Sequence, residues 1–209
     1  MSRDNSHAKL SYSWYGSWTT IYNLYADAQL CFHLENTPLG PPSFMKQSSD
    51  LQNPLQPPTP KEEPGFVPHH IYKKQSEWYH AVRQKYGLPL DSRHLYTKTD
   101  WEFFAVAVAS KPVRSEILES VAQWVNETST DLPFTDLHNT EKDGGFPGPN
   151  FFARPVIGGH FAFLALERAC GGKAMQGLKF LDDDAIEIGS GNGNGNGPSA
   201  ADDLVREDL

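Results

Sequence analysis

Long apolar runs and an excess of basic residues are both missing from this sequence of 209 residues. No segment approaches the ~20 apolar residues that a membrane-spanning helix needs. The N-terminus lacks the basic-then-apolar pattern of a signal peptide. We therefore expect no membrane partner. One glycosylation sequon, Asn126–Glu127–Thr128, is present, and it has meaning only if the chain enters the secretory pathway.

Charge is distributed unevenly along the chain. The segment 182–209 holds eight acidic residues and one basic residue, a net charge of −7, whereas the whole chain carries −8. Residues 1–181 are therefore close to neutral. Proteins that bind nucleic acid need a basic stripe to neutralise phosphates. None is visible here, so we expect no nucleic-acid partner.

Cysteine is scarce, and no cofactor motif is complete. Cys31 and Cys170 make neither a metal cluster nor a disulfide framework. Their places near the ends of apolar helical segments predict two buried free thiols. His69–His70 are neighbours that point in different directions on a helix, which makes them poor co-ligands. Gly158–Gly159 is too sparse for a dinucleotide fingerprint. We expect no metal and no cofactor.

Helical spacing of apolar residues recurs along the chain and predicts an all-α fold of about five helices. The segments are 15–32, 69–86, 101–109 with a start at Thr99 or Asp100, 111–126, and one that begins at Pro155 and ends at Gly171–Gly172. Ser17 is the predicted N-cap of the first helix, and Gly87 is the predicted left-handed residue that ends the second. The third segment is apolar on all sides and therefore buried, whereas the fourth is amphipathic.

Three other segments lack this spacing. Residues 34–65 contain eight prolines and predict an irregular or disordered insertion. Residues 127–153 form a long loop whose phenylalanines require cover. The tail 182–209 is acidic, has a Gly–Asn repeat, and is predicted to be disordered.

The connection between the second and third helices has the composition of a site. Within residues 86–102, charged side chains alternate with aromatic ones, as in a ligand pocket. The charged residues are Asp91, Arg93, His94, Lys98, Asp100 and Glu102, and the aromatic ones include Tyr96 and Trp101. An ordinary helix–helix connection with caps is the alternative interpretation.

Several motifs in order resemble the fungal glutaminase A family, in the C-terminal part of its central domain. They are Gly16–Ser17–Trp18 with Tyr22–Asn23–Leu24 and Asp27, then Gly87–Leu88–Pro89–Leu90–Asp91–Ser92–Arg93 with Tyr96–Thr97–Lys98–Thr99–Asp100–Trp101, then Leu132–Pro133–Phe134–Thr135–Asp136–Leu137, and Phe151–Phe152–Ala153–Arg154–Pro155–Val156–Ile157–Gly158–Gly159–His160–Phe161. The resemblance covers residues 7–33 and 66–181.

The resemblance implies a fold and an activity. The family's central domain is an (α/α)6 toroid of six helical hairpins, so we expect residues 1–33 and 66–181 to form an incomplete toroid. Family members are secreted, extracellular enzymes that hydrolyse L-glutamine to glutamate and ammonia. Compared with a full member, this chain is expected to lack an N-terminal β-rich region and the first hairpins. About five helices cannot close the ring, so we expect an open apolar face on helix 101–109 that favours association.

Hydrolysis of glutamine requires a cation for the α-carboxylate, an anion for the α-ammonium and a base for water. Arg93 or Lys98 is the predicted carboxylate clamp. The predicted acids, for base or ammonium anchor, are Asp91, Asp100 and Glu102; an aspartate at a helix start is also a common cap. The expected pocket also contains Tyr96, Trp101 and Arg154, the last within a second group formed with Asp136, His138 and His160.

Two other functions use the same features. A glycoside hydrolase or carbohydrate binder on the same toroid would use Asp91 and Asp100 as paired acids, with Trp101 stacking on a sugar. A cation beside an acid favours an amino-acid substrate, whereas two acids without a cation favour a sugar. A non-enzymatic remnant is the third alternative, favoured if the inner apolar face is open to water.

Overall fold

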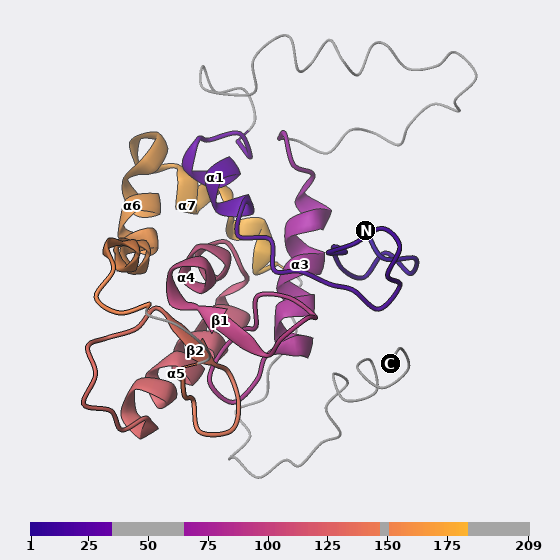
Figure 1. The fold of residues 1–209 in the computed structure, drawn as a ribbon. Helices are drawn as coiled ribbons and strands as arrows, with labels where there is room; N and C mark the ends of the chain where they lie inside the picture. The colour runs from indigo at the N-terminus through magenta and orange to yellow at the C-terminus, as the bar shows by residue number, and fades with distance from the viewer. Residues whose placement is uncertain (35–64, 147–150, 184–209) are drawn as a thin grey trace.

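The structure, a computed structural model, describes residues 1–34, 65–146 and 151–183 (Figure 1). The predictions for the proline-rich insertion and for the acidic tail therefore fall almost wholly outside the described residues.

Helices dominate the described part of the chain, which confirms the predicted class. The α-helices are α1 (Leu24–Gln29), α3 (His69–Val82), α4 (Thr99–Ala107), α5 (Lys111–Glu127), α6 (Ala162–Arg168) and α7 (Ala174–Gly177), and the 3-10 helices are η1 (Pro155–Phe161), η2 (Ala169–Gly172) and η3 (Lys179–Leu181). In Figure 1, α4 lies at the centre, with the other helices arranged around it.

The central helix α4 is buried, as its apolar sequence predicts. Ala105, Val106 and Ala107 are inaccessible to solvent, and α1, α5, α6 and η1 all contact this helix. α5 is amphipathic and packs Val113 and Ile117 into the same core. The predicted alternation of a buried and an amphipathic helix is therefore correct.

The expected open apolar face on the central helix is wrong for the part of the chain that the structure describes. α1, α6 and η1 cover the helix instead. Large apolar side chains are exposed on the covering elements, at Val156, Ile157, Phe161 and Leu164.

Two helix ends differ from the predictions because local side-chain bonds compete with helix formation. Ser17 is not a cap: its hydroxyl donates to the carbonyls of Ser11 and Trp14 in a loop, and α1 begins only at Leu24. α3 ends at Val82, before the predicted end at residue 86. Gly87 closes a tight turn instead, with φ +127° and a hydrogen bond from Gln84 N to its carbonyl.

A small antiparallel sheet is present that the helical pattern does not predict. β1 (Tyr96–Lys98) pairs with β2 (Leu137–Asn139), with Thr97 opposite His138. Each strand has three residues, too few for an alternating pattern to be recognised. The sheet joins the predicted site loop to the long loop 127–153, just before α4 begins.

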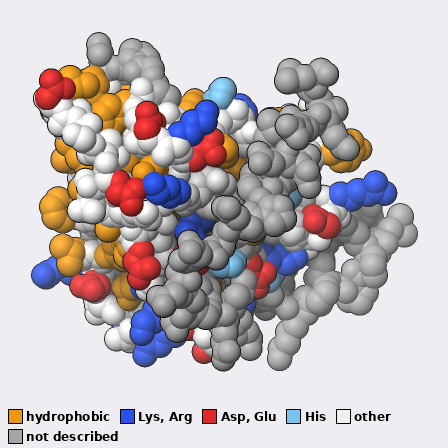
Figure 2. All heavy atoms as spheres, turned by 90° about the horizontal axis from the view of Figure 1, so that it is seen from below, with side chains coloured by type: hydrophobic (Ala, Val, Ile, Leu, Met, Phe, Trp, Pro, Cys, Tyr) orange, Lys and Arg blue, Asp and Glu red, His pale blue; other side chains and the backbone are white. Residues whose placement is uncertain are grey.

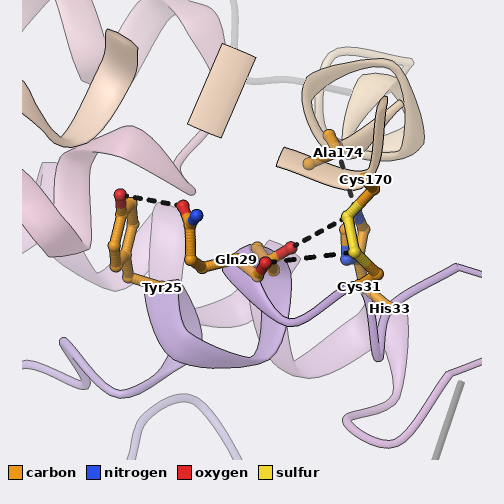
Figure 3. The surroundings of a disulfide bond; sticks show 7 residues. Tyr25, Gln29, Cys31, His33, Cys170 and Ala174 are labelled. Atoms are coloured by element: carbon orange, nitrogen blue, oxygen red, sulfur yellow. Dashed lines mark hydrogen bonds between the residues drawn. A yellow bond between two sulfur atoms is a disulfide. The ribbon is translucent and has the colours of Figure 1, made fainter. Parts of the chain in front are cut away.

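The cysteines form a disulfide, so the prediction of two free thiols is wrong. Cys31 follows α1 and Cys170 lies in η2, with their Cα atoms 5.9 Å apart (Figure 3). Beside this bond, His33 Nε2 donates to the carbonyl oxygen of Ala174 at 2.9 Å. The fold thus brings together two residues separated by 139 positions, which sequence spacing alone does not indicate.

The surface agrees with the near-neutral charge of residues 1–181. In the part of the face in Figure 2 that is not grey, acidic and basic side chains are interspersed with apolar ones. None of the described helices has the length and apolar character needed to cross a membrane.

Candidate active site

The turn from β1 into α4 brings charged residues from three segments together. Thr99, the first residue of α4, is fully buried, and its backbone N–H donates to the carbonyl oxygen of Asp136 at 2.8 Å. This bond fixes the start of α4 against the start of β2. Lys98 and Asp100 flank Thr99, so both lie at this contact.

Asp136 and Arg154 form a two-bond ion pair at this point. Arg154 Nε donates to Asp136 Oδ1 at 2.8 Å, and Nη2 donates to Oδ2 at 2.5 Å. Hydrogen bonds between residues 134–136 and 151–153 hold the two side chains next to each other. Bonding to Asp136 raises the pKa of Arg154. Since Asp136 is fully buried, this pair holds a carboxylate inside the protein.

Lys98 is a cation of the group whose ammonium group has no hydrogen-bond partner among the described residues. Its Nζ lies 3.8 Å from Asp136 Oδ2, beyond hydrogen-bond distance, and 5.0 Å from the ring centroid of Trp101. The ring of Tyr22 stacks on the ring of Trp101, with 4.1 Å between their centroids. The ammonium group therefore lies near both a carboxylate and an aromatic ring.

Asp100 is a buried acid whose hydrogen bonding is incomplete. The residue is 4% exposed, and its Oδ1 has no hydrogen-bond partner among the described residues. Burial raises the pKa of Asp100, the charge of Lys98 opposes this rise, and Asp136 adds to it. A Cβ on Gly159 would lie 2.8 Å from the Cβ of Asp100, so only glycine lets η1 approach this closely.

His160 completes the group from the η1 side. Its Nε2 is hydrogen-bonded to Thr99 Oγ1 at 2.8 Å, and its ring stacks on Phe103 with centroids 4.6 Å apart. Burial lowers the pKa of His160, while Asp100 and Asp136 counteract this effect. The net direction favours the uncharged form of the ring.

We name Lys98, Asp100, Asp136, Arg154 and His160 the junction cluster. Among the described residues, it combines a cation without a hydrogen-bond partner, a buried carboxyl group with one unpartnered oxygen and an imidazole, next to the aromatic ring of Trp101. Such a set fits a small zwitterion, because it offers opposite charges over a short span beside an apolar wall.

Comparison with known proteins assigns the same region to a family. Residues 63–164, which include the junction cluster, match the glutaminase A six helical-hairpin domain. The chain carries part of the glutaminase A six helical-hairpin domain. No solved structure matches it.

Two curated fungal proteins show how much of a glutaminase A the chain represents. It is 68% identical over 182 residues to a probable glutaminase of Arthroderma benhamiae, which covers 87% of this chain and 20% of that protein. It is 40% identical over 161 residues to the glutaminase A of Aspergillus oryzae, with coverage of 77% and 19%. The chain therefore spans about a fifth of these relatives and corresponds to a fragment of a glutaminase-like protein with part of the six-hairpin domain.

Within this glutaminase A domain, four of the predicted site residues lie together at the junction: Lys98, Asp100, Trp101 and Arg154. Their roles stay predictions. Asp136 and His160 are the further members, from the second group noted in the sequence. The sequence marks each of them only by its position: Asp136 comes just before β2, and His160 follows a double glycine.

Asp91 and Arg93 instead pair with each other. Arg93 Nε and Nη2 donate to the two carboxylate oxygens of Asp91 at 2.9 and 2.8 Å. Ser92 N donates to the carbonyl oxygen of Trp18, which anchors the loop to the N-terminal segment. The planar guanidinium group that sequence reasoning assigned to a substrate carboxylate is thus occupied by a protein carboxylate.

Tyr96 lies at the opposite end of β1 from Lys98. It stacks on His94, with centroids 5.0 Å apart, beside a shallow hollow of about 300 Å³. Lys142 and Glu141 line the same hollow. The structure therefore places Tyr96 in a second surface feature.

Glu102 points away from the junction because it lies two positions, about 200° around the helix, from Asp100. It is fully buried, and its Oε1 accepts from Leu88 N at 2.6 Å. Its Oε2 has no partner among the described residues. Burial raises the pKa of Glu102 well above the usual range. In this position Glu102 holds the turn at Gly87 and Leu88.

His138 also supports this turn. Its Nε2 donates to the carbonyl oxygen of Tyr86 at 3.0 Å, and its ring stacks on Trp124 with 3.7 Å between centroids. Burial lowers the pKa of His138 to about 4. Like Glu102, it is a buried polar group that fixes the loop leading to β1.

Proposed function

We propose that the whole protein hydrolyses L-glutamine to glutamate and ammonia, and that the junction cluster of this fragment binds the amino-acid end of the substrate. The observation that carries the proposal is that the charge of Lys98 acts on Asp100. Among the described residues, the Lys98 ammonium has no hydrogen-bond partner and the buried Asp100 carboxyl has one unpartnered oxygen. These are the opposite charges that recognise an α-carboxylate and an α-ammonium on one carbon atom.

The geometry supports a division of roles within the junction cluster. Lys98 binds the α-carboxylate, and Trp101 provides the apolar wall beside it. Arg154 acts as a positioning residue, because both of its bonds go to Asp136. Asp100 binds the α-ammonium, since an ionised carboxylate with a free oxygen accepts a charge-assisted hydrogen bond.

The presence of cations next to the acids favours an amino acid over a sugar. Each of the two acids that a glycoside hydrolase would use, Asp91 and Asp100, has a cation nearby: Arg93 bonds to both carboxylate oxygens of Asp91, and the charge of Lys98 acts on Asp100. The burial of α4 also removes the feature that would favour a non-enzymatic remnant, for the part of the chain described.

Binding of L-glutamine to the 209-residue chain tests this proposal. We expect calorimetric titration to show saturable binding that Lys98→Gln and Asp100→Asn each weaken by about tenfold or more, because a lost charge-assisted bond costs about 1.5–3 kcal/mol. Arg93→Gln is the matched control, since it removes a cation from the neighbouring loop, and it should bind normally.

A second ligand separates the two roles. Glutaramate has the carboxylate and the amide of glutamine but no ammonium, so Asp100→Asn should bind both ligands equally, while the unmodified chain prefers L-glutamine. Equal affinity of the unmodified chain for both ligands would contradict the role of Asp100. A cooperatively folded chain that binds a monosaccharide and no glutamine would refute the assignment of the substrate. Ammonia release, measured on the same samples, reports whether the fragment hydrolyses what it binds.

A further inference from the structure

We propose that Asn126 carries an N-linked glycan. Three observations converge on it: a complete acceptor sequon, a side chain that faces solvent, and a disulfide elsewhere in the fold that belongs to an oxidising compartment. The proposal does not depend on glutamine hydrolysis.

The position of Asn126 on α5 leaves space for a large group. The buried face of α5 includes Val113, Ile117, Val121 and Trp124. Asn126 follows Trp124 by two positions, about 200° around the helix, and is exposed near its C-terminal end. Its neighbour Val125 is 59% exposed. A sugar chain attached here would extend away from the buried face of α5 and would displace no packed side chain of residues 1–34, 65–146 and 151–183.

The third residue of the sequon has a different environment. Thr128 Oγ1 is buried and has no hydrogen-bond partner among the described residues. A Cβ on Gly144 would lie 2.7 Å from this oxygen, so the loop after β2 packs closely against it. Trp124 Nε1 holds that loop by donating to the Gly144 carbonyl oxygen at 2.8 Å.

The timing of the modification follows from this burial. The sequon hydroxyl takes part in acceptor recognition, and in the folded chain the loop covers it. Transfer must therefore precede the packing of this loop on α5, while the asparagine stays exposed afterwards. The folded structure accommodates the product and does not itself serve as the acceptor.

The disulfide indicates the compartment in which transfer takes place. Cys31 and Cys170 join α1 to η2 across 139 residues, and structural disulfides persist in oxidising compartments such as the endoplasmic reticulum. His33 and Ala174 pack around the bond, so it belongs to the folded core (Figure 3). That lumen is also where fungal cells attach N-glycans.

The reaction needs one co-substrate, an oligosaccharide linked to a lipid diphosphate. The amide Nδ2 of Asn126 forms a bond to the C1 atom of the first sugar. The bond between C1 and the diphosphate oxygen breaks, the lipid diphosphate leaves, and one amide proton is released. No electron transfer is involved.

Cell-free translation with microsomes tests the site without requiring secretion. The full 209-residue chain, preceded by a cleavable signal sequence, should show a lower gel mobility that peptide N-glycosidase reverses, leaving aspartate at position 126. Asn126→Gln and Thr128→Ala should abolish the shift. Thr128→Ser keeps the hydroxyl and is the matched control that should retain it. An unshifted parent chain, or a shift that survives Asn126→Gln, overturns the proposal.

Secretion from a fungal host tests whether the folded chain tolerates the glycan. We expect glycosylated chain with no free thiol and with a cooperative melting transition close to that of secreted Asn126→Gln. If Asn126→Gln folds and the glycosylated chain does not, then the assigned outward orientation of Asn126 is wrong and the proposal fails.

Discussion

Acidification should destabilise this protein through His138, which is held neutral in the core. Its ring is fully buried, donates one hydrogen bond to the Tyr86 carbonyl and stacks on Trp124. Its other ring nitrogen, Nδ1, has no partner among the described residues. A proton added there would place an uncompensated charge in the core, which is why the pKa of His138 falls to about 4.

The size of the effect follows from the two pKa values of this residue. In the unfolded chain His138 titrates near 6.5, and in the folded chain near 4. Between these values the unfolded state binds more protons, so the stability present above pH 6.5 is lost as the pH falls. At about 1.36 kcal/mol per pKa unit, the loss between pH 7 and pH 4 is about 3 kcal/mol.

Urea unfolding of the parent chain and of His138→Gln at pH 7 and pH 4 measures this loss in the free energy of unfolding. Glutamine keeps a donor for the Tyr86 carbonyl and does not titrate, while all other groups stay the same in both chains. The parent should lose about 3 kcal/mol more than the variant on acidification. Tryptophan fluorescence follows the transition, since Trp124 contacts the ring. Equal losses in both chains would refute the reasoning.

Three further effects are expected. Replacing Cys31 and Cys170 together by alanine should lower the free energy of unfolding by up to about 5 kcal/mol, the chain-entropy value for a loop this long. Denaturation of the parent chain with and without reductant gives an independent check. Burial raises the pKa of Glu102, so above about pH 4.5 the folded chain holds a proton that the unfolded chain has released, and the free energy of unfolding falls as the pH rises. In unfolding measured as a function of pH, Glu102→Gln should show a smaller fall than the parent chain. Gly159→Ala should cost about 1–3 kcal/mol in thermal unfolding, because the new methyl group meets the backbone of α4, whereas Gly158→Ala, which meets nothing within 4 Å, should change little.

The helical class and the burial of α4 could be predicted because packing produces a periodic pattern. The run from Phe103 to Ala109 is apolar on every side, and no competing element explains it. The start of α5 just after Ser110, with proline in the first turn, is equally predictable. Helix ends were harder to predict where polar side chains bond to nearby backbone, as Ser17 does.

The junction cluster could be predicted only in part, because it depends on pairing between distant segments. Lys98 and Asp100 are close in sequence, and their composition marks the loop. Asp136 and Arg154 reach them through β2 and the bridge between residues 134–136 and 151–153, and such short pairings carry no periodic signal. The partner of Arg93 was missed for a related reason: composition cannot tell whether a guanidinium group bonds to a neighbour or to a ligand.

The bond between Cys31 and Cys170 also changes what a cut in the chain would do. It closes a covalent ring that contains residues 35–64, α3, both strands and the whole junction cluster. A protease that cleaved once between residues 35 and 64 would open this ring without releasing a piece, since the two parts would still be joined through sulfur. The nicked protein would migrate as one species until it was reduced, and only then would it separate into two.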